Sequence, residues 1–173
     1  MFEKIDFKLP EVNFEKLKGP LVIKYGQNPV IAYYNIPDKS LYDKLMSVRV
    51  FLKTPPNHVQ VAEIVGQGHL GPHIDHNINA CANYYLDTNC STTYFYNRKP
   101  DQEGTIYPGM DKPNIFKFDQ VTLVSAFTAQ PKDFYLLDVS SIHSVLSPGW
   151  KVRRFITWQW AVDSYLTVKN SLS

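Results

Sequence analysis

The chain has 173 residues, a length typical of a single domain that can bury a sizeable core without disulfides as staples. Its 18 Lys and Arg balance 16 Asp and Glu to a formal charge of only +2, which argues against a nucleic-acid or membrane-surface face. It has neither a signal peptide nor the roughly 18 apolar residues of a transmembrane helix, so we expect a soluble, cytoplasmic protein with Cys81 and Cys90 reduced.

The N-terminal third predicts a supporting layer over residues 1–56. Two short apolar runs at 21–25 and 30–34 flank the turn signal at 26–29, which indicates a strand, a turn and a strand. A helix is expected from Ser40 to about Val50, with Ser40 as its cap and Asp43 completing a capping box. Pro55 and Pro56 end it, because proline lacks the amide hydrogen that a helix needs.

From residue 57 the pattern changes to strands, in a chain rich in aromatic residues (11 Tyr, 10 Phe and 3 Trp). No linker, repeat or low-complexity tract divides the sequence, so we expect one domain with a core at 57–163 and a C-terminal tail at 164–173. Many short strands separated by turn signals favour a mostly β sandwich or barrel, with the helix packed outside one sheet. The expected strands are 58–65, 81–86, 92–96, 114–118, 121–126, 134–139, 142–146 and 152–162.

The residues best suited to chemistry lie in a histidine-rich run at 68–77. His73 and Asp75 are two residues apart, so on a strand an imidazole and a carboxylate would point to the same face. They would supply two ligands of a facial metal triad, and the third would be His58 or His143. A His-x-Asp pair alone is weak support, because it arises readily by chance in a chain with five histidines.

The surroundings of His143 strengthen this interpretation. The turn signal at 147–149 follows it, and the strand beyond that turn begins with Arg153, ten residues after His143. A turn of this kind returns the chain antiparallel, so the arginine can come back towards the metal. A guanidinium there can hold a carboxylate by paired charged hydrogen bonds.

The combination of His73-Ile74-Asp75, His143 and Arg153 resembles the motif of the Fe(II)/2-oxoglutarate-dependent dioxygenases, and most closely that of their prolyl-hydroxylase-like members. Tyr85 occupies the place of a tyrosine that contacts 2-oxoglutarate in this family. The segments 93–95 and 132–137 also resemble family strands, and the likeness covers about residues 58–162.

This resemblance implies a double-stranded β-helix (a jelly-roll or cupin-like barrel) in which His73, Asp75 and His143 bind Fe(II). 2-Oxoglutarate would chelate the iron, and Arg153 would hold its 5-carboxylate with help from Tyr85. Dioxygen would take the last position, and the enzyme would hydroxylate a C–H bond of a small molecule or peptide side chain. No nucleic-acid or membrane partner is expected, and the oligomeric state is open.

Three other residues bear on the 2-oxoglutarate pocket. Asn83 lies on the same strand face as Tyr85, and Thr157 lies on the same face as Arg153, so both can line the pocket. Arg154 is the alternative to Arg153 as the carboxylate clamp. Arg153 is favoured, because Arg154 shares its face with apolar residues that suit packing under a helix.

Two rival functions remain open. A cupin-like metal- or ligand-binding barrel would share the metal ligands but lack oxygenase activity, and Arg153 argues against it. A structural jelly roll would carry an accidental His-x-Asp and bind no metal.

Overall fold

The computed structural model describes residues 1–173 except 10–11, 26–28, 109–110, 151 and 173. Within these ranges the helices are α1 (Phe14–Leu17), α2 (Lys39–Met46) and α3 (Tyr165–Ser171), with single 3-10 turns at Arg49–Phe51 and Phe118–Gln120. None of these helices is long and apolar enough to cross a membrane. The strands are β1 (Phe2–Lys4), β2 (Leu21–Tyr25), β3 (Val30–Tyr34), β4 (His58–Val65), β5 (Gly68–His73), β6 (Ala80–Asp87), β7 (Thr92–Arg98), β8 (Val121–Thr128), β9 (Phe134–Leu137), β10 (Ile142–Ser147) and β11 (Arg153–Trp160).

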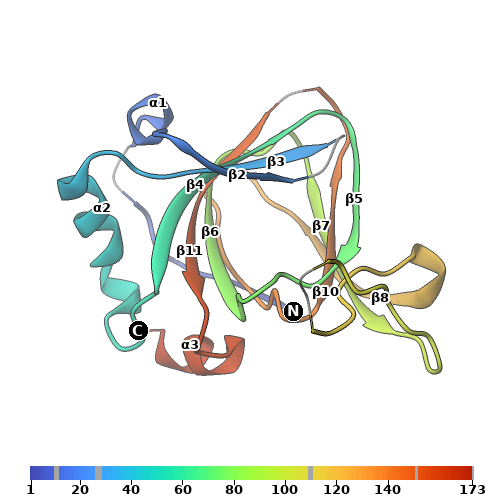
Figure 1. Ribbon diagram of the computed structural model, residues 1–173. Helices are drawn as coiled ribbons and strands as arrows, with labels where there is room; N and C mark the ends of the chain where they lie inside the picture. Colours follow the sequence, from blue (N-terminus) through green and yellow to red (C-terminus); the bar gives the residue numbers. More distant parts are fainter. Residues whose placement is uncertain (10–11, 26–28, 109–110, 151, 173) are drawn as a thin grey trace.

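The strands form two antiparallel sheets that face each other (Figure 1). The larger sheet has the order β1-β9-β6-β11-β4-β3-β2, and the smaller has the order β5-β10-β7-β8. From β4 to β11 the chain alternates between the sheets, except at the β7–β8 pair, which lies wholly in the smaller one. This interleaved order is that of a double-stranded β-helix, and it confirms the expected fold class. Strands β1, β2 and β3 widen the larger sheet.

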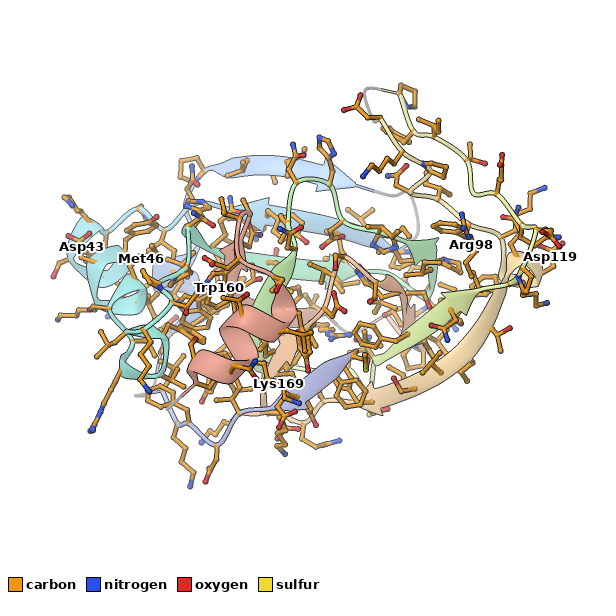
Figure 2. All side chains as sticks on the ribbon, turned by 90° about the horizontal axis from the view of Figure 1, so that it is seen from below. Asp43, Met46, Arg98, Asp119, Trp160 and Lys169 are labelled. Carbon is orange, nitrogen blue, oxygen red and sulfur yellow. The ribbon has the colours of Figure 1, made fainter. Side chains whose placement is uncertain are left out.

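The helices cover the outer face of the larger sheet, where α2 packs on β4, and α3 on β6 and β9. Strand β11 shows how the two faces differ: Ile156, Trp158 and Trp160 belong to the core under the helices, whereas Phe155 belongs to the core between the sheets. The indole of Trp158 donates to the Leu45 carbonyl at the end of α2 (2.8 Å). Figure 2 shows Trp160 between the helix of Met46 and that of Lys169.

Several predicted elements need correction. The helix spans Lys39–Met46 and its cap is Asp38, whose carboxylate accepts a hydrogen bond from the Leu41 amide (3.0 Å). Ser40 is not the cap, and Asp43 pairs with Lys39 on the exposed surface instead of closing a capping box. Asp38 is a better N-cap than Ser40 because an aspartate at the helix start also interacts favourably with the positive end of the helix dipole.

The strand predicted at 114–118 is also wrong. Ile115 makes only isolated bridges, to His73 and Thr105, and a 3-10 turn begins at Phe118. The segment is held beside the end of β5, where the Phe116 amide donates to Pro72 (2.9 Å). Strands β1 and β5 and helices α1 and α3 were not predicted, and α3 lies in the expected C-terminal tail. The turn expected at 26–29 falls largely outside the described residues.

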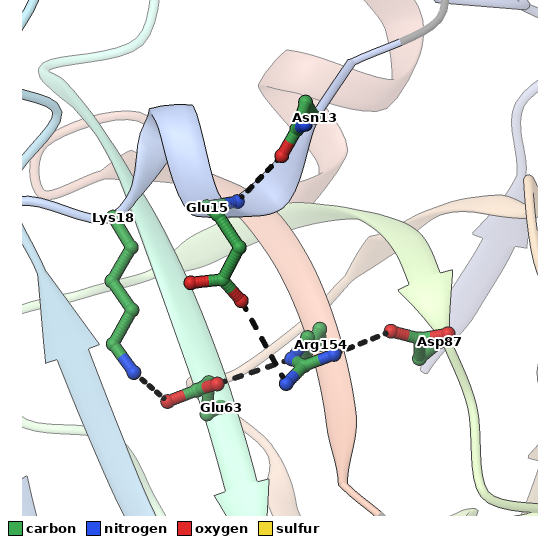
Figure 3. Close-up of polar contacts among 6 residues, drawn as sticks. All are labelled: Asn13, Glu15, Lys18, Glu63, Asp87 and Arg154. Carbon is green, nitrogen blue, oxygen red and sulfur yellow. Dashed lines mark hydrogen bonds and ion pairs between the residues drawn. The ribbon is translucent and has the colours of Figure 1, made fainter.

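A network of ion pairs fastens α1 to the larger sheet (Figure 3). Glu63, on β4 and nearly buried, accepts from Lys18 Nζ at 2.7 Å and from Arg154 Nε at 3.1 Å. Arg154 also reaches Asp87 at 3.3 Å and Glu15 at 3.9 Å. Burial alone would favour protonated Glu63, but the hydrogen bonds from Lys18 and Arg154 outweigh it and hold its pKa below the usual value.

Replacing Glu63 with Gln should therefore destabilise the protein in a pH-dependent way. A carboxyl whose pKa is lowered by folding stabilises the fold above its unfolded pKa, and that contribution is lost as the pH falls through the folded pKa. Urea unfolding should show that Glu63→Gln lowers the free energy of unfolding by about 1–3 kcal/mol at pH 7. The difference from the wild type should shrink below about pH 4.

The matched control is Asp87→Asn, because the Asp87 side chain is 53% exposed and its ion pair is screened by water. It should cost less than about 1 kcal/mol at either pH. An equal effect of Glu63→Gln at pH 7 and pH 3 would contradict the assigned role of this carboxylate.

Candidate metal centre and carboxylate pocket

Three candidate metal ligands meet at one end of a cavity between the two sheets. His143 on β10 lies opposite His73 on β5, so their side chains project from the same face of the smaller sheet, with ring centroids 4.4 Å apart. Asp75 Oδ1 is 3.4 Å from His73 Nε2 and 3.6 Å from His143 Nε2. One ligand atom from each residue lies within 4.8 Å of the others, close enough for one ion to bind all three.

His58, the alternative third ligand, belongs to a different part of the molecule. It begins β4, as expected, and its Nδ1 lies 3.0 Å from the hydroxyl of Tyr42 on α2. Of the two candidates, the structure brings only His143 to His73 and Asp75.

Asp75 is brought close to the two histidines in a different way from the one predicted. Strand β5 ends at His73, so Asp75 does not share a strand face with it. The Asp75 amide instead donates to the Val139 carbonyl (3.1 Å), and the Ile74 amide donates to the Asn114 carbonyl (2.9 Å). Backbone hydrogen bonds to two other segments thus direct the carboxylate towards the histidines.

Both imidazoles are oriented by backbone carbonyls. His73 Nδ1 lies 2.8 Å from the Gly71 carbonyl, and His143 Nδ1 lies 3.0 Å from the Ser141 carbonyl. Because a carbonyl oxygen only accepts, each Nδ1 is the protonated nitrogen. In each ring Nε2 is therefore the nitrogen that faces Asp75 and is available to a metal ion, as in a metal-binding histidine.

The charges of the cluster suit a cation. Burial lowers the pKa of His143 to about 4, and the neighbouring His73 adds to this effect, so His143 is neutral at physiological pH. Burial alone would raise the pKa of Asp75, but His143 and His73 outweigh it, so Asp75 is an anion. For His73, burial is outweighed by the hydrogen bond and charge of Asp75, which raise its pKa. Two imidazoles and one carboxylate are the donor set of a facial triad.

The same cavity contains the buried guanidinium of Arg153, which is 2% exposed. Its Nη2 donates to the Thr93 hydroxyl (3.2 Å), while Nε and Nη1 have no hydrogen-bond partner among the described residues. Its Cζ lies 4.6 Å from the centroid of the Tyr85 ring. An unpaired buried charge costs several kcal/mol, so this arrangement is suited to an anion that enters the cavity.

Of the remaining predicted pocket residues, Asn83 and Thr157 line the same cavity, while Tyr85 lies against the guanidinium but does not line the cavity. Tyr85 is fully buried, and its hydroxyl and Asn83 Oδ1 lack partners in the described part of the chain. Burial raises the pKa of Tyr85 more than Arg153 lowers it, so the hydroxyl stays protonated and can donate. Thr157 is also buried.

Arg154 points to the other side of the sheet. Its three acidic partners lie on the outer face (Figure 3), and it does not line the cavity. The structure thus places Arg153, the favoured candidate, inside the cavity and pairs the alternative on the surface.

Thr93 and Cys81 are among the cavity residues that were not identified from the sequence. Thr93 anchors Arg153, and its strand alternation with Phe95 could have revealed its inward direction. Cys81, two residues before Asn83, also lines the cavity, and burial raises the pKa of its thiol well above the usual value. Both cysteines are free thiols, as expected.

The other two histidines lie outside the site. His76 is exposed. His69 is on β5 and lies on the outer face of the smaller sheet. There its Nε2 is 3.0 Å from the Ser144 hydroxyl and its ring is 4.7 Å from that of Phe118.

No protein-family model and no curated protein matches the sequence. Solved structures of similar fold include the Escherichia coli ribosomal oxygenase YcfD, with 8% identity and a TM-score of 0.47 over 81% of this chain and 34% of that one. The epimerase SnoN, solved with Fe3+, alpha ketoglutarate and nogalamycin RO, has 11% identity and a TM-score of 0.47 over 79% of this chain and 66% of that one. The capsular polysaccharide assembling protein CapF from Staphylococcus aureus has 13% identity and a TM-score of 0.36 over 86% of this chain and 30% of that one.

This chain spans about a third of the length of YcfD. At these identities the likeness concerns the fold, which the strand order of this chain defines independently. The chemistry of the site follows from its own side chains.

Proposed function

We propose that this protein is a non-haem Fe(II) oxygenase that uses 2-oxoglutarate and dioxygen and hydroxylates a C–H bond of a small molecule or peptide side chain. The main support is one cavity that contains both the His-Asp-His cluster and a buried arginine without a carboxylate partner among the described residues. A simple metal-binding barrel has no need of such an arginine, and a structural jelly roll has no need of either feature.

In this proposal His73, Asp75 and His143 would hold the iron, and cosubstrate and dioxygen would use the coordination positions that these three side chains do not fill. Arg153 binds the 5-carboxylate of 2-oxoglutarate through Nε and Nη1, and the Tyr85 hydroxyl donates to the same group. When bound, iron, 2-oxoglutarate and dioxygen supply the oxidising chemistry, which releases succinate and carbon dioxide and transfers one oxygen atom to the substrate.

The protein contributes a preformed pocket. Apolar side chains such as Ile64, Val145 and Phe155 line the cavity together with Arg153 and lower its polarity. An ion pair between the guanidinium and a carboxylate is stronger in such surroundings than in water. Because Thr93 and the Tyr85 ring already hold Arg153, little reorganisation is needed when the carboxylate binds.

Asp75→Ala should abolish metal binding, because it removes the only anionic ligand of the cluster. Calorimetry with Mn(II) under argon should show affinity weakened by at least roughly 100-fold, since removing a ligand costs more than disturbing its support. The control is His76→Ala, which removes an exposed imidazole next to Asp75 and should bind Mn(II) like the wild type. Wild-type affinity in Asp75→Ala would show that the metal site is wrongly assigned.

Arg153→Met should weaken 2-oxoglutarate binding to the Mn(II)-loaded protein by about 10- to 150-fold, because it removes charged hydrogen bonds worth about 1.5–3 kcal/mol. Affinity for Mn(II) should not change, and the apo protein should remain folded, since the change removes an uncompensated buried charge. Calorimetry measures both affinities, and denaturant unfolding measures stability.

Arg154→Met is the matched control, because it removes the adjacent arginine and leaves the cavity intact. It should lower stability but bind 2-oxoglutarate normally. If Arg154→Met lost 2-oxoglutarate and Arg153→Met kept it, the clamp would be wrongly assigned. A wild type that bound Mn(II) but not 2-oxoglutarate would indicate the cupin-like barrel, and one that bound neither would indicate a structural jelly roll.

A further inference from the structure

The turn between β9 and β10, residues 138–141, contacts two of the three candidate ligands through its backbone. The Val139 carbonyl accepts the hydrogen bond of the Asp75 amide (3.1 Å), and the Ser141 carbonyl lies 3.0 Å from His143 Nδ1. One ligand lies in the segment after β5 and the other in β10. The relative placement of these two ligands therefore depends on how the peptide planes of one short turn are oriented.

Asp138 fixes the conformation of this turn. Its Oδ1 accepts from the Ser140 hydroxyl at 2.6 Å, and its Oδ2 accepts from the Ser141 hydroxyl at 2.7 Å. The Ser141 amide also donates to the Asp138 carbonyl (3.2 Å). The side chain of Asp138 is only 15% exposed, which favours these bonds over competing bonds to water. Both carboxylate oxygens are thus used within the turn, on the two residues that follow Val139.

Other contacts attach the turn to its surroundings but do not replace these bonds. The Asp138 amide donates to the Met1 carbonyl (2.8 Å), and the Ser140 amide donates to the Asn79 carbonyl (3.3 Å). The N-terminal ammonium lies 3.9 Å from Asp138 Oδ2, a separation that gives only a weak ion pair. The Ser140 amide belongs to the same peptide unit as the Val139 carbonyl, so its bond to Asn79 also orients that carbonyl. The two serine hydroxyl bonds to Asp138 hold the turn in a compact conformation.

We propose that Asp138 is a positioning residue for the metal centre: it orders the turn whose carbonyls aim Asp75 and His143 at the same ion. The physical reason is that groups supporting metal ligands must hold them within about 0.5 Å of productive geometry. Without the carboxylate, the hydroxyls of Ser140 and Ser141 lose their acceptor, and the turn that carries the carbonyls of Val139 and Ser141 is held less tightly. The inference rests on the proposed metal site but not on 2-oxoglutarate.

The test compares Asp138→Ala with Asp133→Ala, which removes a carboxylate at the other end of β9. Asp133 also uses both oxygens, one with Lys4 Nζ (2.6 Å) and one with the Gln130 amide (2.9 Å), but it does not contact the turn at 138–141. Co(II) and Mn(II) are titrated calorimetrically under argon, and the visible spectrum of bound Co(II) reports its coordination geometry. Urea unfolding of the apo proteins measures stability separately.

Asp138→Ala should bind Co(II) and Mn(II) about 10- to 100-fold more weakly than the wild type, with an altered Co(II) spectrum. Asp133→Ala should lower stability and leave affinity and spectrum unchanged. Asp138→Asn should lie between the wild type and Asp138→Ala, because the amide keeps one acceptor. Should Asp138→Ala fail to fold, Ser141→Ala serves instead, and it should also weaken metal binding.

Three outcomes overturn the proposal, and they are distinguishable. If the wild type binds Co(II) and Asp138→Ala has the same affinity and spectrum, Asp138 is not a positioning residue, and the proposed function is unaffected. If the wild type binds neither Co(II) nor Mn(II), both the proposed metal site and the role of Asp138 are wrong. Equal losses of affinity in Asp133→Ala and Asp138→Ala would show a general effect of stability and would also overturn the proposal.

Discussion

The antiparallel pairing of β10 with β5 is the constraint on which the site depends. It places His143 directly opposite His73, and opposite residues in such a ladder share one face of the sheet. That face looks into the space between the sheets, where Arg153 of β11 enters from the other layer. Shifting the pairing by one residue would turn one imidazole to the outer face and leave only one histidine inside.

The two-residue period of β11 separates two charges that are adjacent in sequence. Arg153 is enclosed between the sheets and lacks an anionic partner among the described residues, whereas Arg154 is neutralised by acidic groups on the outer face. The outer arginine helps to attach α1 to the sheet, and the inner one makes the cavity receptive to anions. Two adjacent arginines therefore have different roles: Arg154 stabilises the fold, and Arg153 remains a buried charge without an anionic partner among the described residues.

Much of the fold could be predicted because its strands are long and strongly patterned. The bounds of β4 were correct, and the split of β11 into a polar inner face and an apolar outer face placed Arg153 correctly. Short elements such as α1, β1 and α3 were missed, because three to seven residues carry too little periodicity and are stabilised mainly by tertiary contacts. The route by which Asp75 reaches the histidines was wrong for the same reason, since the hydrogen bond that directs it comes from Val139, distant in sequence.

The helices pack against the larger sheet, whereas the outer face of the smaller sheet is covered in part by the small cluster of Phe116, Val121 and Ile142. Strands β5 and β10, which supply both histidines, belong to this smaller layer. Segments with fewer buried contacts open locally at lower free-energy cost than the rest of a domain. An ion bound by His73, His143 and Asp75 would link two strands and a loop of that layer, and since it binds only the closed form, it would suppress such opening in proportion to its affinity. Metal occupancy would then control the local rigidity of the half of the barrel that carries the site.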